Sequence, residues 1–249
     1  RLLNMSIYYP PEHYDTNMVN LAILFGRPQA VSVYSGSRQD NVGGRLQVYY
    51  MTKAFHRMLG LSRMEQVEFQ DNDINRCIVS YSNGARAWVN RSGEDWSVDE
   101  YVLPPEGYLV RRPDGFLEYR AKKDGETVDV VHAEEYDYFS CPNRIDFGPI
   151  VTDGALAIRV EQPDRLVLYE VVKPRGTVEL RLGELRGTRR GQKALEIAVV
   201  LTRNRSIKLV FPEFRQLTQP QDRTQLSNLV QFRPVEMRNT LRYEIQLGP

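Results

Sequence analysis

The sequence predicts a mainly β protein, in which two antiparallel β-sandwich domains follow a short α/β segment with one long amphipathic helix. From residue 62 onward, short runs rich in β-branched and aromatic residues alternate with turns rich in Asp, Asn, Pro and Gly. Between residues 40 and 60, apolar side chains recur instead at the spacing of a helix. We therefore expect three parts, at residues 1–61, 62–145 and 146–249.

Composition and charge restrict the class of protein. The chain has 249 residues, of which 41% are hydrophobic and 26% charged, and this is typical of a folded protein with a real core. Its 33 basic and 32 acidic residues leave a net charge of +1, so no overall field attracts nucleic acid or an anionic membrane. No apolar run approaches the ~20 residues that cross a bilayer. We expect neither nucleic acid nor a membrane as partner.

The first part of the chain mixes strand and helix signals. Leu2–Tyr9 has the alternation of a strand and is stopped by two prolines, which cannot donate to a ladder. The apolar run Val19–Phe25 is either a buried strand or a helical segment, because periodicity alone does not separate them. A helix is predicted from about Val42 to Leu59, with Gly60 as its stop. Its apolar face, which we interpret as core packing, consists of Val48, Met51, Phe55, Met58 and Leu59.

The second part is predicted to be antiparallel sheet. Its centre is a hairpin of strands Cys77–Ser82 and Ala85–Asn90, joined by Asn83-Gly84 in a type I′ turn with positive φ at both residues. Further strands are predicted at Glu65–Gln70, through Trp96 and Val98, and at Gly107–Arg111, Phe116–Ala121, Thr127–His132 and Tyr136–Cys141.

The third part is predicted to be an immunoglobulin-like sandwich. Apolar residues alternate with polar ones in several runs, so each strand has one dry and one wet face. About seven such strands in a hundred residues are typical of this fold, although the chain lacks a Cys-Trp-Cys pattern. The alternating sets begin with Leu156, Ile158 and Val160 and end with Leu241, Tyr243, Ile245 and Leu247.

One stretch resembles a known protein class. From Tyr81 the sequence has an Asn-Gly turn, a strand ending in Val89-Asn90, Trp96, and then Leu103-Pro104-Pro105-Glu106-Gly107-Tyr108. This pattern is similar to the small β-domain that follows the catalytic (β/α)8 barrel in several glycoside hydrolase families. The resemblance covers about thirty residues well and the segment before it loosely.

The resemblance implies an architecture and a role. Residues 1–61 would be the end of the barrel, and the opening RLLNMSIYYPP reads as the interior of a domain, so we expect a piece of a longer protein. The β-domains would brace the barrel, and the chain alone would catalyse nothing. Its partners would be the rest of the parent polypeptide and a polysaccharide or oligosaccharide. The alternative is a non-catalytic carbohydrate-binding or structural β-sandwich protein.

Glycoside hydrolysis needs two carboxylates that flank the scissile bond. The loop after the first predicted strand supplies Glu12, His13 and Asp15 as candidate catalytic residues, with Tyr9 and Tyr14 able to stack on a sugar. An ordinary polar loop is the simpler interpretation of these residues.

Two tryptophans are the remaining candidates for a substrate contact. Trp88 and Trp96 would bind a sugar if their rings were exposed on a sheet face, and would be core residues if they were buried. Their exposure therefore distinguishes a carbohydrate-binding protein from a bracing one.

No metal or cofactor is expected. The three histidines, His13, His56 and His132, are too far apart in sequence for a zinc motif. Cys77 and Cys141 are far apart too, and form either one disulfide or two buried thiols, of which we favour the thiols. The cellular location stays open, with an extracytoplasmic one favoured.

Overall fold

The computed structural model describes residues 16–26, 42–59, 62–162, 165–181, 195–200, 209–210, 230–232 and 240–245. The chain divides into two units, Arg1–Glu134 and Glu135–Pro249. Strands predominate in the described residues of both units, and the described helices are α1 (Thr16–Phe25) and α2 (Val42–Leu59).

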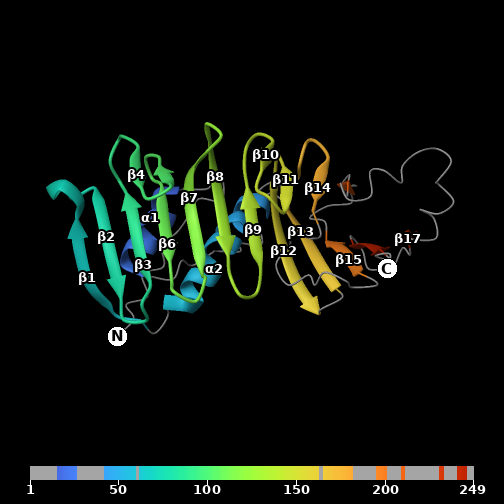
Figure 1. Cartoon of the computed structure of the whole chain (residues 1–249), viewed down its shortest axis with the longest axis horizontal. Helices are drawn as coiled ribbons and strands as arrows, with labels where there is room; N and C mark the ends of the chain where they lie inside the picture. The colour runs from blue at the N-terminus through green and yellow to red at the C-terminus, as the bar shows by residue number, and fades with distance from the viewer. Residues whose placement is uncertain are drawn as a thin grey trace, which may run out of the picture. The chain divides into compact units, whose positions relative to one another are not determined.

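The first unit is built on one antiparallel sheet with the order β1-β2-β3-β6-β7-β8 (Figure 1). The hairpin of β4 and β5 joins this sheet through β7, where Val102 pairs with Lys122. The bounds are β1 (Met64–Phe69), η2, a 3-10 turn (Gln70–Asn72), β2 (Arg76–Tyr81), β3 (Arg86–Asn90), β4 (Trp96–Val98), β5 (Tyr101–Leu103), β6 (Tyr108–Arg111), β7 (Leu117–Lys123) and β8 (Glu126–His132).

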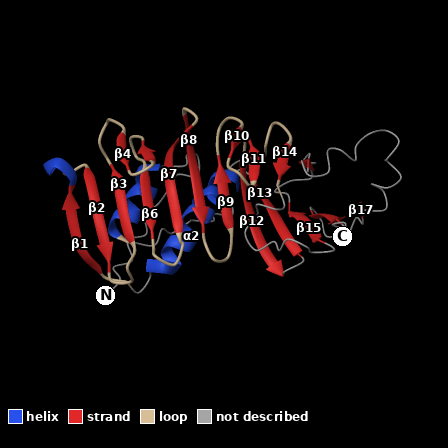
Figure 2. Ribbon diagram, in the orientation of Figure 1, coloured by secondary structure: helices blue, strands red, loops and turns tan. Residues whose placement is uncertain are grey.

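The two faces of this sheet have different coverings. Helices α1 and α2 lie on one face, α1 against β3 and α2 against β8 (Figure 2). We call this the helix face; the pairing register assigns Cys77, Val79, Tyr81, Ala87, Val89, Tyr108 and Val110 to it. On the opposite face, which we call the hairpin face, a cluster forms around the β4–β5 hairpin from Ile78, Trp96, Val98, Leu103, Leu109 and Ala121. The strands thus contribute alternate side chains to two separate apolar layers.

The second unit contains two sheets. The larger has the order β9-β12-β13-β15-β18-β17, and the smaller the order β10-β11-β14-β16. Two neighbouring pairs, β13 with β15 and β14 with β16, run parallel, and the other pairs are antiparallel. The bounds are β9 (Asp137–Ser140), β10 (Ile145–Asp146), β11 (Ile150–Thr152), β12 (Ala155–Gln162), β13 (Arg165–Val172), β14 (Val178–Leu180), β15 (Leu195–Val200), β16 (Leu209–Val210), β17 (Val230–Phe232) and β18 (Thr240–Ile245).

Most of the predicted elements are confirmed. The long helix has the predicted bounds, and Met51, Phe55 and Leu59 of its predicted apolar face are buried. The ambiguous run Val19–Phe25 is helical and belongs to α1. The mainly β class is confirmed, with its large sheet mostly antiparallel. The arrangement as two sandwiches stays a prediction, and the predicted strand Leu2–Tyr9 lies outside the described residues.

One turn differs from the prediction. The hairpin between β2 and β3 is present, but the type I′ turn is wrong, because Gly84 has a φ of 80° while Asn83 is not a positive-φ residue. The Tyr81 amide donates to the Ala85 carbonyl at 2.9 Å, so the loop has three residues, Ser82-Asn83-Gly84. A third loop residue places only the glycine in the left-handed region.

Candidate functional site: polar contacts between the helices and the sheet

The end of β2 provides a hydrogen-bond donor for the last turn of α1. The Tyr81 hydroxyl donates to the carbonyl of Ile23 at 2.7 Å and lies 3.4 Å from that of Leu24. Carbonyls in the last turn of a helix lack intrahelical partners, so an outside donor stabilises the helix end. Tyr81 is only 3% exposed, and burial raises the pKa of its hydroxyl, which therefore stays a donor at neutral pH.

The turn that follows β2 provides a hydrogen-bond donor for the last turn of α2. The side-chain nitrogen of Asn83 donates to the carbonyl of Met58 at 3.0 Å, one residue before the helix ends. Its side-chain oxygen accepts from the Ala85 amide at 3.1 Å, which orders the turn that carries it. One three-residue loop thus links the β2–β3 hairpin to α2.

A third contact comes from α1 itself. Asn20 is completely buried, and its Nδ2 donates to the carbonyls of Asn90 and Gly107, both at 3.3 Å. Its Oδ1 has no hydrogen-bond partner. An amide in a short apolar helix is costly to bury unless it is hydrogen-bonded, so these two bonds are what permits Asn20 at this position.

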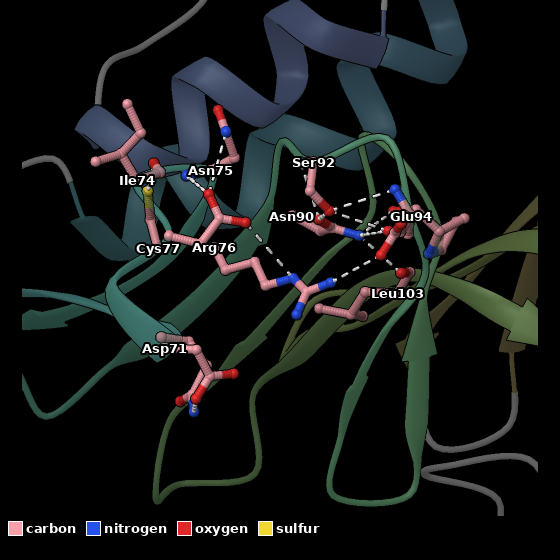
Figure 3. A network of polar contacts seen from close by, with 12 residues as sticks. Asp71, Ile74, Asn75, Arg76, Cys77, Asn90, Ser92, Glu94 and Leu103 are labelled. Atoms are coloured by element: carbon pink, nitrogen blue, oxygen red, sulfur yellow. Dashed lines mark hydrogen bonds and ion pairs between the residues drawn. The ribbon is translucent and has the colours of Figure 1, made fainter.

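Asn90 is the centre of the sheet side of this contact (Figure 3). Its Nδ2 lies 2.8–2.9 Å from the carbonyls of Glu94, Leu103 and Pro104, and its Oδ1 accepts from the amide and hydroxyl of Ser92. The Asn90 amide also donates to the Gly107 carbonyl at 2.9 Å. The loops on either side of the β4–β5 hairpin are therefore held at one buried amide.

Gly107 has no side chain, and this leaves space for the backbone of Pro104 and Arg120 to approach it closely. A Cβ at this position would lie 2.7 Å from the Pro104 carbonyl and 2.9 Å from that of Arg120. Only glycine lets these three backbone segments approach so closely. We name Asn20, Tyr81, Asn83 and Asn90 together the helix clamp, since their side chains or backbone join both helices to the sheet.

A second pair of loops lies beside Asn90. The Arg76 guanidinium contacts Asp73 at 3.9 Å and Glu94 at 3.7 Å (Figure 3). The Arg91 amide donates to the Asn75 carbonyl. The Glu94 side chain is 86% exposed, so that ion pair contributes little to stability. The backbone bond is the firmer of the two connections.

Buried acidic groups lie on the helix face farther along the sheet. By pairing register, Tyr108, Glu118, Arg120 and Asp129 share that face. The Tyr108 hydroxyl donates to Glu118 at 3.3 Å, while Arg120 forms an ion pair with Asp129 at 2.7 Å. Glu118 has no exposed surface and its Oε2 has no hydrogen-bond partner.

Burial shifts the pKa values of both acids upward. Desolvation raises the pKa of Glu118 well above its ordinary range, with a smaller contribution from the charge of Asp129. Desolvation also raises the pKa of Asp129, against the attraction of Arg120. Although two carboxylates are the chemistry of a glycosidase, these two are too buried to touch a sugar.

The structure places only part of the predicted site. Tyr9, Glu12, His13, Tyr14 and Asp15 lie outside the described residues.

The two tryptophans come together in the hairpin-face cluster. Trp96 is 7% exposed, and Trp88 packs against the same cluster while half-buried. The Arg86 guanidinium lies 5.1 Å from the Trp88 ring centroid, and Tyr101 meets Tyr119 at 4.8 Å with the rings tilted by 58°. The aromatic rings therefore pack among themselves and against a cation and do not form an exposed flat platform.

The described part of the chain shows neither a metal-ligand cluster nor a disulfide. No group of three or more His, Cys, Asp or Glu residues gathers there as metal ligands would. Cys77 and Cys141 are buried free thiols, as favoured from the sequence. No helix among these residues has the length and apolar character to cross a membrane.

Sequence reasoning missed the role of the helix clamp. The sequence pattern includes Tyr81, Asn83 and Asn90 only as parts of a β-rich stretch, and Asn20 is not among the predicted site residues. A usable signal was present, because Asn20 is the only strongly polar residue within the apolar run from Met18 to Phe25. A lone amide in such a run has to find partners when it is buried.

The fold and site define a mainly β protein whose first sheet holds two helices through buried polar contacts. No protein-family model matches the chain, and neither the curated proteins nor the solved structures contain a match.

Proposed function

We propose that this chain is a C-terminal portion of a carbohydrate-active enzyme of the glycoside hydrolase type, and that its β-rich units brace the catalytic part without being catalytic themselves. The helix clamp is the observation that carries this proposal. It lies largely within the residues on which the resemblance rests, and its hydrogen bonds go to helix ends and loop carbonyls. Such contacts fix the position of the helices relative to the sheet.

The positions of the two helices support the same role. Helices α1 and α2 precede the sheet in sequence and pack on it, as the last helices of a preceding domain would. The donors from Tyr81 and Asn83 act at the C-terminal ends of both helices, where carbonyls need partners. A β-domain that holds both helix ends restricts how the segment before it can move.

Exposed apolar side chains supply a surface for the rest of the parent polypeptide. Phe25 is 51% exposed at the end of α1, and Tyr49 is 43% exposed on α2. Strand β1, at the end of the strand order, has all 6 residues exposed, with Val67 at 42% and Phe69 at 50%. Val67 and Phe69 lie two positions apart on β1, so their side chains share one side of the strand, which another part of the protein can cover.

The alternative of carbohydrate binding has less support. A sugar stacks on an exposed aromatic face, but Trp96 is buried and the Trp88 ring is shared with Arg86. In a bracing domain these rings would be core residues, and their packing in the hairpin-face cluster supports that role.

A two-part assay tests the proposal. The purified chain is incubated with a panel of aryl glycosides and applied to a glycan array, and we expect neither turnover nor binding. Turnover that is lost in Glu12→Gln would make the chain catalytic. Glycan binding that is lost in Trp88→Ala would make it a carbohydrate-binding protein. Either result overturns the bracing role.

A second experiment gives a positive readout. The reading frame upstream of Arg1 is sequenced, and we expect it to encode alternating strands and helices of a barrel. That upstream domain is then expressed separately and mixed with this chain. We expect the mixture to show a higher thermal unfolding midpoint for the upstream domain than the domain has alone. Val67→Glu and Phe69→Glu should abolish the effect, whereas Ser97→Glu, at an exposed position of β4, should not. An unchanged midpoint with the unaltered chain contradicts the proposal.

A further inference from the structure

Asn83 combines a structural contact with a chemically labile position. When asparagine precedes glycine, the glycine amide nitrogen attacks Cγ of the side chain most readily, because glycine has no Cβ to hinder the approach. The attack expels the side-chain nitrogen as ammonia and closes a cyclic imide. Water then opens the ring to aspartate or isoaspartate. The net reaction consumes one water, releases one ammonia and involves no oxidation. Asn83-Gly84 is the sole Asn-Gly pair in the sequence.

In the folded protein every group that takes part in this reaction is held. The attacking nitrogen of Gly84 donates to the Tyr81 carbonyl at 2.9 Å. The side-chain oxygen of Asn83 accepts from the Ala85 amide, and the nitrogen that would leave donates to Met58 of α2. The ring can therefore close only after the turn has opened and has separated from the helix.

The product cannot restore the contact. A carboxylate only accepts hydrogen bonds, so the aspartate or isoaspartate formed from Asn83 would place a negative charge against the Met58 carbonyl where the amide had donated. That carbonyl lies at the C-terminal end of α2, which already carries partial negative charge. In the aspartate product the bond from the Ala85 amide would persist, because it needs only an acceptor, whereas isoaspartate lengthens the main chain by one carbon and also changes the turn.

We propose that Asn83 is a deamidation site which docking of α2 protects, and at which deamidation releases the C-terminal end of α2 from the sheet. Opening of the turn exposes the labile pair, and the reaction then prevents the original contact from re-forming. The deamidated fraction of the molecules therefore increases irreversibly with the time that this end of α2 has spent detached. This inference stands on the geometry of the turn and is independent of the proposed function.

The first test measures the rate of deamidation. The chain is kept at mildly alkaline pH, and the peptide that contains residues 83–84 is followed by mass spectrometry, folded and in urea. We expect the folded chain to react at least about fivefold more slowly, the factor that corresponds to roughly one hydrogen bond. Phe55→Ala, which removes a buried side chain of α2, should accelerate the reaction. Leu168→Ala, which removes a buried side chain in the second unit, should not. Equal rates in the folded and unfolded chain would overturn the protection.

The second test measures the consequence. The deamidated fraction of the wild-type chain is separated by ion exchange through its additional negative charge. We expect amide hydrogen exchange in the last turns of α2 to be about fivefold faster than in the unmodified fraction, with exchange in β4–β5 unchanged. Asn83→Asp should reproduce this pattern. Unchanged exchange in α2 would show that the site carries no release mechanism.

Discussion

In the first unit, the helices and the β4–β5 hairpin attach to the same sheet through different mixtures of apolar and polar contact. On the helix face, buried apolar side chains of helix and strand, such as Phe55 and Val79, form a layer, and hydrogen bonds from Tyr81 to Ile23 and from Asn20 to Gly107 are added to it. On the hairpin face, the cluster around Trp96 is apolar, and the Asn90 side chain holds the loops beside the hairpin. The hydrogen bonds of the helix face thus join helices to the sheet, whereas those of the Asn90 side chain join loops.

This difference has consequences for tolerance to change. Apolar packing is spread over many contacts, so its loss scales with the volume removed and is largest for the largest side chain. A buried hydrogen bond depends on one donor, and its loss leaves a defined acceptor unpaired. We expect substitutions on the hairpin face to lower stability broadly, and substitutions in the helix clamp to loosen particular segments.

The largest effect is expected for Trp96→Ala. Trp96 is 7% exposed within the hairpin-face cluster, and its removal leaves a cavity that costs about 3–5 kcal/mol in the free energy of unfolding. Urea denaturation of the purified chain measures this. Ser97→Ala, at the next and exposed position of β4, is the control and should stay within about 0.5 kcal/mol of wild type. A loss below about 1 kcal/mol for Trp96→Ala would mean that the hairpin does not depend on this ring.

Asn90→Ala is expected to rank second, at about 3 kcal/mol. The substitution removes the donor to three buried carbonyls and the acceptor for Ser92, although the Asn90 backbone contacts can remain. Hydrogen exchange should rise in the segments around Glu94 and Pro104 more than elsewhere. If exchange rose equally across the whole first unit, the local role assigned to Asn90 would be wrong.

The secondary-structure elements and the contacts between them differ in how well the sequence predicts them. The β2–β3 hairpin and helix α2 follow from local periodicity and turn residues, which act over a few positions. The contacts of the helix clamp join residues 58, 70 and 87 positions apart, and no local pattern specifies such partners. The predicted turn type is wrong, because Asn-Gly favours a two-residue type I′ loop but also fits a three-residue loop with glycine in the left-handed region.

Glu118→Gln tests the cost of the buried acid on the helix face. Because desolvation raises its pKa above the ordinary 4.5, the fold favours the protonated carboxyl. The stabilising effect of that protonated group is complete below about pH 4.5 and falls as the pH rises toward the folded-state pKa. Glutamine stays neutral and keeps an acceptor for Tyr108, so the variant should gain about 1–3 kcal/mol over wild type at neutral pH and nothing at pH 4. Stability measured from pH 4 to 8 decides this. A gain that is independent of pH would contradict the role of the charge.

Tyr81→Phe should have the smallest effect, because its acceptor keeps another partner. The Gly26 amide also donates to the Ile23 carbonyl, at 3.3 Å, so loss of the hydroxyl costs only about 1 kcal/mol in the free energy of unfolding.

The effect of Tyr81→Phe should also depend on pH, because burial raises the pKa of the Tyr81 hydroxyl above the ordinary 10.0. The wild-type protein therefore keeps the contribution of the neutral hydroxyl below pH 10 and loses it as the pH rises toward the folded-state pKa. Phenylalanine does not titrate, so the difference in the free energy of unfolding between wild type and Tyr81→Phe should become smaller above pH 10. Hydrogen exchange should increase in the last turn of α1 and stay constant in the β4–β5 hairpin. A deficit that stays constant up to pH 11 would show that the hydroxyl is not the buried donor on which the attachment of α1 depends.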